Sequence, residues 1–146
     1  MSRHIIFKMS IKNNPYTHLL PEDVPVWERF LAKFGCQFYS IKYDVRVGNG
    51  RPIAPTELPN MQKMAIMLSQ RRIDAVAYST AGIIVIEITR FGDLKSIGQL
   101  EAYPILYKDK FQPRAKVTPL LVCEALDSDI KPILDQLGID YVLLPE

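Results

Sequence analysis

The segment RRIDAVAYSTAGIIVIEITRF, residues 71–91, decides the fold and contains the main chemical question of this sequence. Two apolar, β-branched runs flank the turn sequence STAG, a pattern that predicts a buried β-hairpin. Each run nevertheless contains one carboxylate, Asp74 in the first and Glu87 in the second. Because a buried carboxylate is costly without a partner, these two acids mark the candidate functional position.

The predicted turn also determines which residues face each other across the hairpin. With the turn centred between Thr80 and Ala81, antiparallel pairing places Asp74 opposite Glu87, with Cβ atoms roughly 5 Å apart on one face. Two carboxylates at this distance repel each other unless a cation or a shared proton lies between them. A hard divalent cation, Mg²⁺ or Mn²⁺, binds carboxylate oxygens, so Asp74 and Glu87 are the predicted metal ligands.

The same register places Arg72 opposite Thr89, next to the two acids. A second interpretation needs no metal: an ion pair between Asp74 and Arg72, or between Glu87 and Arg90, would also account for acids at a strand end. The other face of the hairpin is predicted to be a packed core face, made by Ile73, Ala75, Ala77, Ile84, Ile86 and Ile88.

Outward from the hairpin, helical periodicity and strand alternation divide the rest of the chain. The predicted helices span residues 21–35, about 58–70, 91–111 and 127–138. The further predicted strands span residues 36–48, 117–126 and 139–146. The order α-β-α-β-β-α-β-α-β predicts a single-domain α/β fold, with a central mixed β-sheet flanked by helices.

Three details of these elements are specific enough to test. Asp93 is the predicted N-cap of the helix after the hairpin, and Pro104 is expected to kink or weaken that helix. In the helix at 58–70, the residues predicted to be available for packing are Met61, Ala65, Met67 and Leu68. Residues 21–146 are expected to form one domain, and residues 1–20 an N-terminal arm or edge strand.

Charge is unevenly distributed along the chain. The formal net charge of +2 is too small to indicate nucleic-acid binding by itself, but residues 42–72 contain six basic and two acidic residues. The last twenty residues have the opposite balance, with five acidic residues and one lysine. The basic half is therefore a candidate surface for an anionic partner such as DNA.

The sequence lacks an N-terminal secretion signal and an apolar run near the roughly 20 residues of a membrane-spanning helix. Cys36 and Cys123 have no metal-type spacing, which indicates structural thiols in a reducing compartment. His4 and His18 have no metal partner at helical spacing and are predicted to be surface residues. We therefore expect a cytoplasmic protein without a membrane partner.

The hairpin acids and the following helix resemble the PD-(D/E)XK nuclease superfamily. Its pattern is an acid on one strand and (D/E)-x-K on the next, within an α-β-β-β-α-β core. Asp74 matches the first acid, and Glu87, Ile88 and Thr89 occupy the (D/E)-x-K position. The resemblance covers residues 21–145 and implies a restriction-endonuclease-like fold and metal-dependent hydrolysis of DNA phosphodiester bonds.

The helix after the hairpin extends the resemblance. The sequence GQLEAY contains Gln99 and Tyr103, similar to the Q-x-x-x-Y element of RecB-like and phage exonuclease-like members. The resemblance implies that these two residues orient the DNA strand or the water shell of the metal. Arg90 is a further candidate binding residue, and Glu28 could correspond to a helix acid that some members use.

The sequence departs from the family at Thr89, which takes the place of the motif lysine. In the family that lysine is thought to position or activate the attacking water and to stabilise negative charge, and a threonine supplies no positive charge for either role. Arg72 and Lys95 are the candidate catalytic replacements. Thr89 itself is then a candidate binding residue.

Two functions remain open from the sequence, beside a third interpretation, an α/β scaffold whose acids only form ion pairs. The first is a metal-dependent DNA nuclease, a hydrolase with a degenerate active site, supported by the paired acids. The second is a catalytically silent nuclease-fold protein, a structural or DNA-contacting component of an assembly such as a phage neck or head-completion complex. Thr89 favours the second function, which implies a homo-oligomer or phage structural proteins as partners and a virion-associated location.

Overall fold

The computed structural model describes residues 16, 18–55 and 57–146, and at its centre is a five-stranded sheet in the order β1-β2-β3-β4-β5. The strands are β1 (Ser40–Val47), β2 (Arg71–Ser79), β3 (Gly82–Gly92), β4 (Val117–Leu126) and β5 (Asp140–Leu143). The first three strands pair antiparallel, and β3, β4 and β5 pair parallel. The sheet is therefore mixed, as predicted.

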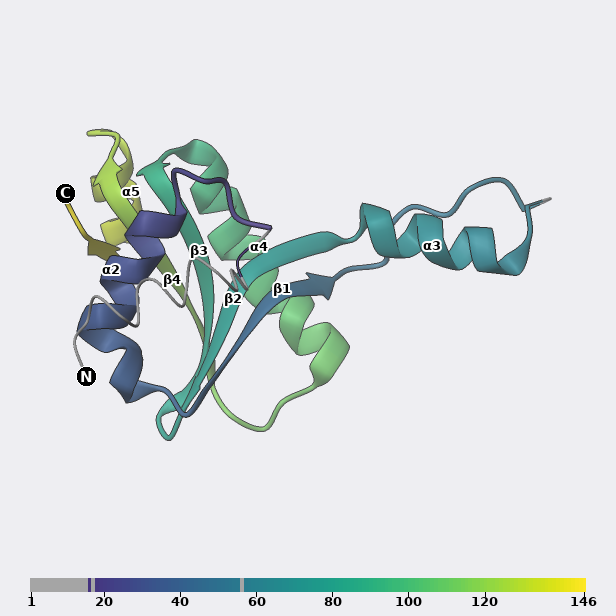
Figure 1. Ribbon diagram of the computed structural model, residues 1–146, viewed down its shortest axis with the longest axis horizontal. Helices are drawn as coiled ribbons and strands as arrows, with labels where there is room; N and C mark the ends of the chain where they lie inside the picture. The colour runs from purple at the N-terminus through teal and green to yellow at the C-terminus, as the bar shows by residue number, and fades with distance from the viewer. Residues whose placement is uncertain (1–15, 17, 56) are drawn as a thin grey trace.

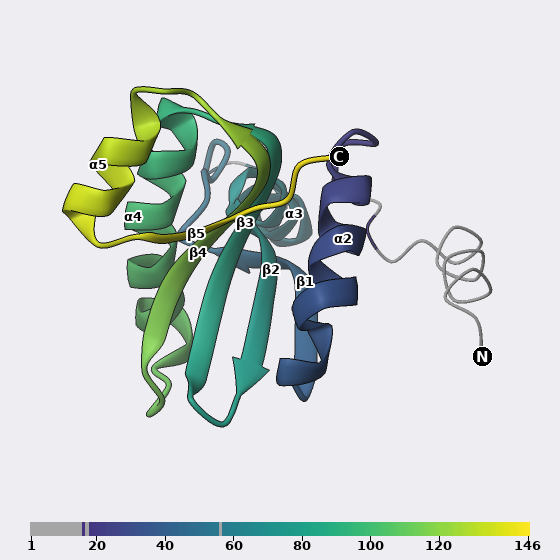
Figure 2. The same ribbon diagram turned by 90° about the vertical axis from the view of Figure 1, so that its left-hand side faces the viewer.

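Helices lie on both faces of this sheet. They are α2 (Val24–Phe34), α3 (Pro59–Ser69), α4 (Leu94–Phe111) and α5 (Ile130–Leu137), with a short 3₁₀ turn at Gly35–Gln37. Figure 2 shows α2 on one side of the strands and α4 and α5 on the other. The predicted α/β fold class is confirmed. None of the helices among the described residues is long and apolar enough to cross a membrane.

The β2–β3 hairpin has the predicted register. Ser79 pairs with Gly82 and Ala75 pairs with Ile86, so the turn is centred between Thr80 and Ala81. Gly82 has a φ of +145°, and a Cβ there would lie 2.7 Å from the carbonyl oxygen of Lys116. Position 82 therefore requires glycine, and this glycine fixes the turn that determines the β2–β3 pairing.

The face under α2 contains the largest buried side chains. Trp27 and Phe30 stack with ring centroids 5.0 Å apart and pack on the small residues Ala75 and Ala77 of β2. The indole Nε1 of Trp27 donates a hydrogen bond of 3.1 Å to the hydroxyl of Tyr43. Alanine on the strand leaves the volume that the tryptophan fills, so this face is tightly packed.

The face under α4 has its own core, and here one predicted residue changes sides. Ile73 packs with Val47 and Tyr107 on this face, whereas the alternation predicted it on the other face with Ala75. The reason is a local change in β1, where Asp44 has a φ of +53°. Tyr43 packs on the α2 side and Val45 on the α4 side, so the alternation of side chains reverses at this point.

α3 does not cover the sheet. Figure 1 shows it projecting from the body at the far end of β1 and β2. No residue of α3 is buried, so Met61, Ala65, Met67 and Leu68, predicted to be available for packing, are not part of the core of the body. Helical periodicity shows that a helix has an apolar side, but it does not show what covers that side.

The remaining local predictions have mixed outcomes. Asp93 caps α4 by accepting the N–H of Ser96, as predicted. Pro104 is buried inside α4, which continues to Phe111, and the expected kink or weakening of the helix stays a prediction. The predicted N-terminal arm lies mostly outside the described residues, which include Tyr16 and Leu19 packed in the α2-side core.

Candidate functional site

Asp74 and Glu87 lie side by side where the β2–β3 ladder ends. The last pair of that ladder is Ala75 with Ile86, so the two acids occupy the next position in the same register. Oδ2 of Asp74 accepts the backbone N–H of Ile88 at 2.9 Å, which holds the carboxylate against β3. The predicted juxtaposition of the two acids is therefore present.

The electrostatics of this pair are unusual because both groups are shielded from water. Burial raises the pKa of Glu87 well above its ordinary value, and the neighbouring Asp74 carboxylate raises it further. Burial also raises the pKa of Asp74. The interaction between the two carboxyl groups acts to lower the pKa of Asp74 and raises the pKa of Glu87, so Glu87 is the member of the pair that binds a proton more readily.

One oxygen of the pair is left without a partner. Glu87 is only 4% exposed, and its Oε1 makes no hydrogen bond within the part of the chain that the structure describes. A buried oxygen without a donor is strongly unfavourable and needs an explanation. An external cation or proton donor at this position would satisfy it.

A pocket of about 300 Å³ opens over these acids. The N-terminal loop, the beginning of α2, the strand pair and the first turns of α4 all contribute to its wall. The lining residues are His18, Leu19, Leu20, Asp23, Asp74, Glu87, Ile88, Thr89, Asp93, Lys95, Ser96 and Gln99.

Lys95 is in this pocket, and Arg72 is not. The ammonium group of Lys95 acts to lower the pKa of Glu87, against the larger effect of burial. The guanidinium group of Arg72 instead forms a bidentate ion pair with Asp44, with 2.7 Å between Nη2 and Oδ2. The ion pair with Asp44 engages the Arg72 guanidinium outside the pocket, whereas Lys95 lines the pocket beside the acids.

Arg72 does not face Thr89, because the β2–β3 ladder ends before it reaches Arg72. Arg72 was predicted opposite Thr89, but β2 pairs with β3 only from Ala75 onward. At Arg72 the strand still pairs with β1, opposite Arg46. Because the strands diverge at Asp74, the register that correctly paired the acids does not extend to Arg72.

The other predicted binding residues are divided between the pocket and the core. Thr89 lines the pocket, and so does Gln99, whose amide acts to lower the pKa of Tyr103 against the larger effect of burial. Tyr103 is buried in the α4-side core and does not form the pocket wall. Glu28 is not among the lining residues.

Arg90 lies elsewhere, although its backbone contributes to the site. Its side chain is exposed and forms an ion pair with Glu124, 3.2 Å from Nε to Oε2. Its backbone N–H donates to Oδ1 of Asp23 at 2.7 Å. Together with the Arg72–Asp44 pair, this excludes both ion pairs that were the alternative explanation for Asp74 and Glu87.

Sequence reasoning missed several pocket residues, of which Asp23 and His18 bond directly to the backbone of the strand pair. Asp23, at the N-cap of α2, is 6% exposed, and burial and the charge of Asp74 raise its pKa. His18, predicted at the surface, is half-buried, and its Nε2 lies 2.9 Å from the carbonyl oxygen of Asp74. The acidic PED sequence was a signal for Asp23, but no local pattern indicated that the loop of His18 returns to this strand.

The donor set fits a small hard cation. Among the described residues, no three His, Cys, Asp or Glu side chains lie close enough together to enclose a metal ion. Mg²⁺ needs only one or two carboxylates, because it keeps several of its water ligands. Asp74 and Glu87 with the free Oε1, beside an open pocket, meet this requirement.

No protein-family profile and no curated protein sequence matches the chain. The solved structure of EndoMS in complex with double-stranded DNA matches 87% of this chain at 17% identity, with a TM-score of 0.51 and 46% of that chain covered. Apo EndoMS matches 85% at 17% identity, with a TM-score of 0.49 and 46% of that chain covered. A repair endonuclease from Pyrococcus abyssi matches 99% at 16% identity, with a TM-score of 0.44 and 47% of that chain covered.

This chain therefore spans about half the length of each of these proteins. At such low identity, the likeness to the EndoMS complex concerns the fold alone. The chain has a nuclease-like α/β fold.

Proposed function

We propose that this chain is a metal-dependent DNA phosphodiesterase whose reaction centre is the pocket over Asp74 and Glu87. The observation that carries the proposal is the buried carboxylate pair with Oε1 of Glu87 unpartnered beside that pocket. The two arginines that could have formed ion pairs with these acids, Arg72 and Arg90, are paired elsewhere. The nuclease-like fold supports DNA as the substrate.

In this proposal Asp74 and Glu87 hold Mg²⁺ or Mn²⁺. When bound, the ion polarises the scissile phosphate and makes a metal-bound water more acidic. Lys95 supplies positive charge at the pocket wall, where it offsets the negative charge that develops on the phosphate oxygens. It takes the electrostatic role that Thr89 lacks.

The remaining pocket residues orient the substrate and exclude water. Gln99, at the pocket wall on α4, presents an amide to a phosphate or a water. Asp23 holds the end of β3 through the Arg90 N–H and thereby keeps Thr89 at the pocket wall. Leu19 and Leu20 cover one side and limit the water around the acids.

A cleavage assay tests this function directly. Single- and double-stranded DNA are incubated with the protein and Mg²⁺ or Mn²⁺, beside Asp74→Asn and Glu87→Gln. We expect each substitution to reduce cleavage by on the order of 10²–10³-fold, because it removes a charged metal ligand. Asp140→Asn, an exposed acid on β5, is the matched control and should retain activity. Cleavage that survives both pocket substitutions would contradict the proposal.

The replacement of the motif lysine has its own test. We expect Lys95→Met to reduce the rate of cleavage by on the order of 10-fold or more, and Arg72→Met to have a smaller effect. Both variants lose one exposed cation, so the general attraction for DNA falls equally. The opposite ranking would assign the role to Arg72.

One observation, Thr89 at the lysine position, favours a second candidate: a catalytically silent nuclease-fold component of an assembly, such as a phage neck or head-completion complex. It would contact DNA or phage structural proteins and be cytoplasmic or virion-associated. DNA binding that is independent of divalent metal, with no cleavage of any substrate, is its expected signature. Metal-dependent cleavage lost in Glu87→Gln would exclude it.

A further inference from the structure

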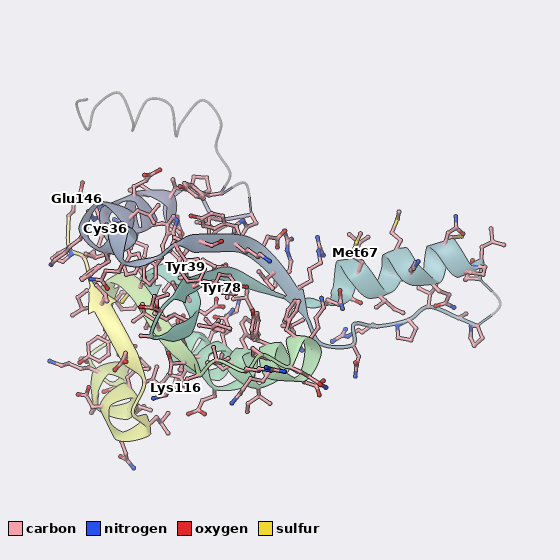
Figure 3. The ribbon with its side chains drawn as sticks, turned by 90° about the horizontal axis from the view of Figure 1, so that it is seen from below. Cys36, Tyr39, Met67, Tyr78, Lys116 and Glu146 are labelled. Carbon is pink, nitrogen blue, oxygen red and sulfur yellow. The ribbon has the colours of Figure 1, made fainter. Side chains whose placement is uncertain are left out.

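The projecting helix α3 has an apolar side that nothing in the described chain covers. We define the arm as residues 48–70 and the arm face as Leu58, Met61, Met64, Met67 and Leu68. These five side chains are between 45% and 65% exposed. Figure 3 shows Met67 on α3, at the end of the helix nearest the strands. So many large apolar side chains on one short helix indicate a contact surface.

The opposite side of α3 is closed by the arm itself. The Gln62 amide bonds to both the N–H and the carbonyl of Ile53, each at 2.9 Å. A Cβ on Gly50 would lie 2.3 Å from the carbonyl oxygen of Ile66, so the returning segment touches the helix backbone. Residues 62, 66 and 69 share this inner side, and Met61, Met64, Met67 and Leu68 project from the rest of the helix surface, with Leu58 at the N-cap.

The chemistry of the arm face selects its occupant. α3 contains no acidic residue, and Lys63 is its only charged residue. A row of methionine and leucine side chains gains little from a phosphate backbone, but it gains from an equivalent apolar row that excludes water. The arm face therefore suits a second apolar helix.

The charges at the two ends of the arm favour a second copy in the antiparallel orientation. Glu57, at the tip, is the only acid between residues 48 and 70, whereas Arg51 and Arg71 lie at the base. A twofold axis at Met64 places Met61 of one copy beside Met67 of the other. The same axis brings the acidic tip of each arm toward the basic base of its partner, and opposes the two helix dipoles.

The size of the surface is sufficient for such a contact. Covering the arm faces of two copies would bury on the order of 1,000 Å² in total, at the lower limit for a specific interface. The projection of α3 in Figure 1 leaves room for two arms to pack without contact between the bodies. The expected dimer is therefore weak and concentration-dependent.

We propose that the arm face is a homodimer contact, in which α3 from two copies of this chain packs antiparallel about Met64. The contact stands on the arm alone and is independent of the nuclease activity proposed above.

Sedimentation across a range of protein concentrations tests the dimer. Wild-type protein should show a monomer–dimer equilibrium, and Met64→Glu with Leu68→Glu should weaken it by at least about 100-fold, because it places charges in the apolar contact. Ile105→Glu, on the exposed side of α4, is the matched control and should dimerise normally. A wild-type protein that stays monomeric, or a dimer unaffected by the arm variant, overturns the proposal.

Disulfide cross-linking tests the orientation. In a Cys36→Ser background, Met64→Cys should form a linked dimer on mild oxidation, because the twofold axis brings the two Cβ atoms together. A mixture of Met61→Cys and Met67→Cys should form the mixed dimer in preference to either homodimer. Leu94→Cys, equally exposed near the body, should remain monomeric. Preferential Met61→Cys homodimers, or an arm that binds DNA as a monomer, would overturn the antiparallel contact.

Discussion

The strands β1 and β2 pass through two regions with opposite environments. In the body, α2 and α4 cover these strands and the neighbouring β3, where the acid Glu87 is 4% exposed. Beyond Val47 and Arg71 the same two chain segments lead into the arm, where Leu68 is 65% exposed. One region therefore places a carboxylate in the interior, and the other places leucine and methionine in water.

The comparison of the body with the arm shows that the burial of a side chain is decided by the neighbouring elements and not by residue type alone. An acid in the interior and an apolar helix in solvent are both unfavourable for an isolated folded domain. Such violations are expected at functional positions, where an external ligand or partner compensates for them. The metal proposed for the acids and the second copy proposed for the arm are compensations of this kind.

The largest expected contrast between the two regions is in packing energy. Phe30→Ala, in the α2-side core, should reduce the free energy of unfolding by about 3–5 kcal/mol, because it leaves a cavity against the sheet. Met64→Ala on the arm should change it by less than about 0.5 kcal/mol at concentrations where the protein is monomeric. Urea denaturation measures both values. An equal loss would show that the arm belongs to the body's cooperative core.

A metal should stabilise the acid region and leave the arm unchanged. Mg²⁺ at 100 times its dissociation constant would raise the free energy of unfolding by about 2.7 kcal/mol, because it binds the folded state. The increase should be present at pH 8 and absent in Glu87→Gln. Thermal unfolding with EDTA or Mg²⁺ measures it, with Met64→Ala as the control that keeps the response. An equal response in Glu87→Gln would place the ion elsewhere.

The pH dependence without metal should be smaller but diagnostic. The folded protein raises the pKa of both Asp74 and Glu87, so the stabilisation linked to their protons is complete below the ordinary carboxyl pKa. It is lost as the pH rises through the raised values. In EDTA, Asp74→Asn should therefore gain on the order of 1 kcal/mol over wild type at pH 8 and nothing at pH 4. If the free energy of unfolding changed equally with pH in the two proteins, the proposed repulsion between the buried Asp74 and Glu87 would be refuted.

The smallest expected effect is that of removing the arm. Val47 and Arg71 are paired, so an Asn-Gly turn in place of residues 48–70 should close the β1–β2 hairpin. Because no residue of α3 is buried, the free energy of unfolding of the monomer should change by less than about 1 kcal/mol. Circular dichroism during urea denaturation measures this change. Loss of folded structure would break the division between body and arm.

Much of the fold was predictable because its decisive interactions are local. The STAG turn and its glycine set the β2–β3 register over a few residues, and that register placed Asp74 beside Glu87. Capping by Asp93 and the apolar periodicities also act within one element. These short-range patterns were sufficient for the fold class and for the acid pair.

The rest of the site depends on contacts between segments distant in the sequence. His18 reaches Asp74 across 56 positions, and Asp23 reaches the Arg90 N–H across 67. Arg72 was assigned to the site by extending an ideal register, but the strand divergence and Asp44 direct it elsewhere. None of these contacts has a periodic signal, because each depends on the path of a loop or the twist of a strand.

The α/β fold class, the hairpin and the placement of Asp74 beside Glu87 followed from the sequence alone, because turn chemistry and strand alternation act over neighbouring residues. Only the tertiary structure decided that Lys95 and Asp23 share the pocket with those acids, that Arg72 does not, and that α3 stands away from the sheet. Burial is a property of the assembled elements, and it gives the pair Asp74 and Glu87 its altered protonation and Glu87 its unpartnered oxygen.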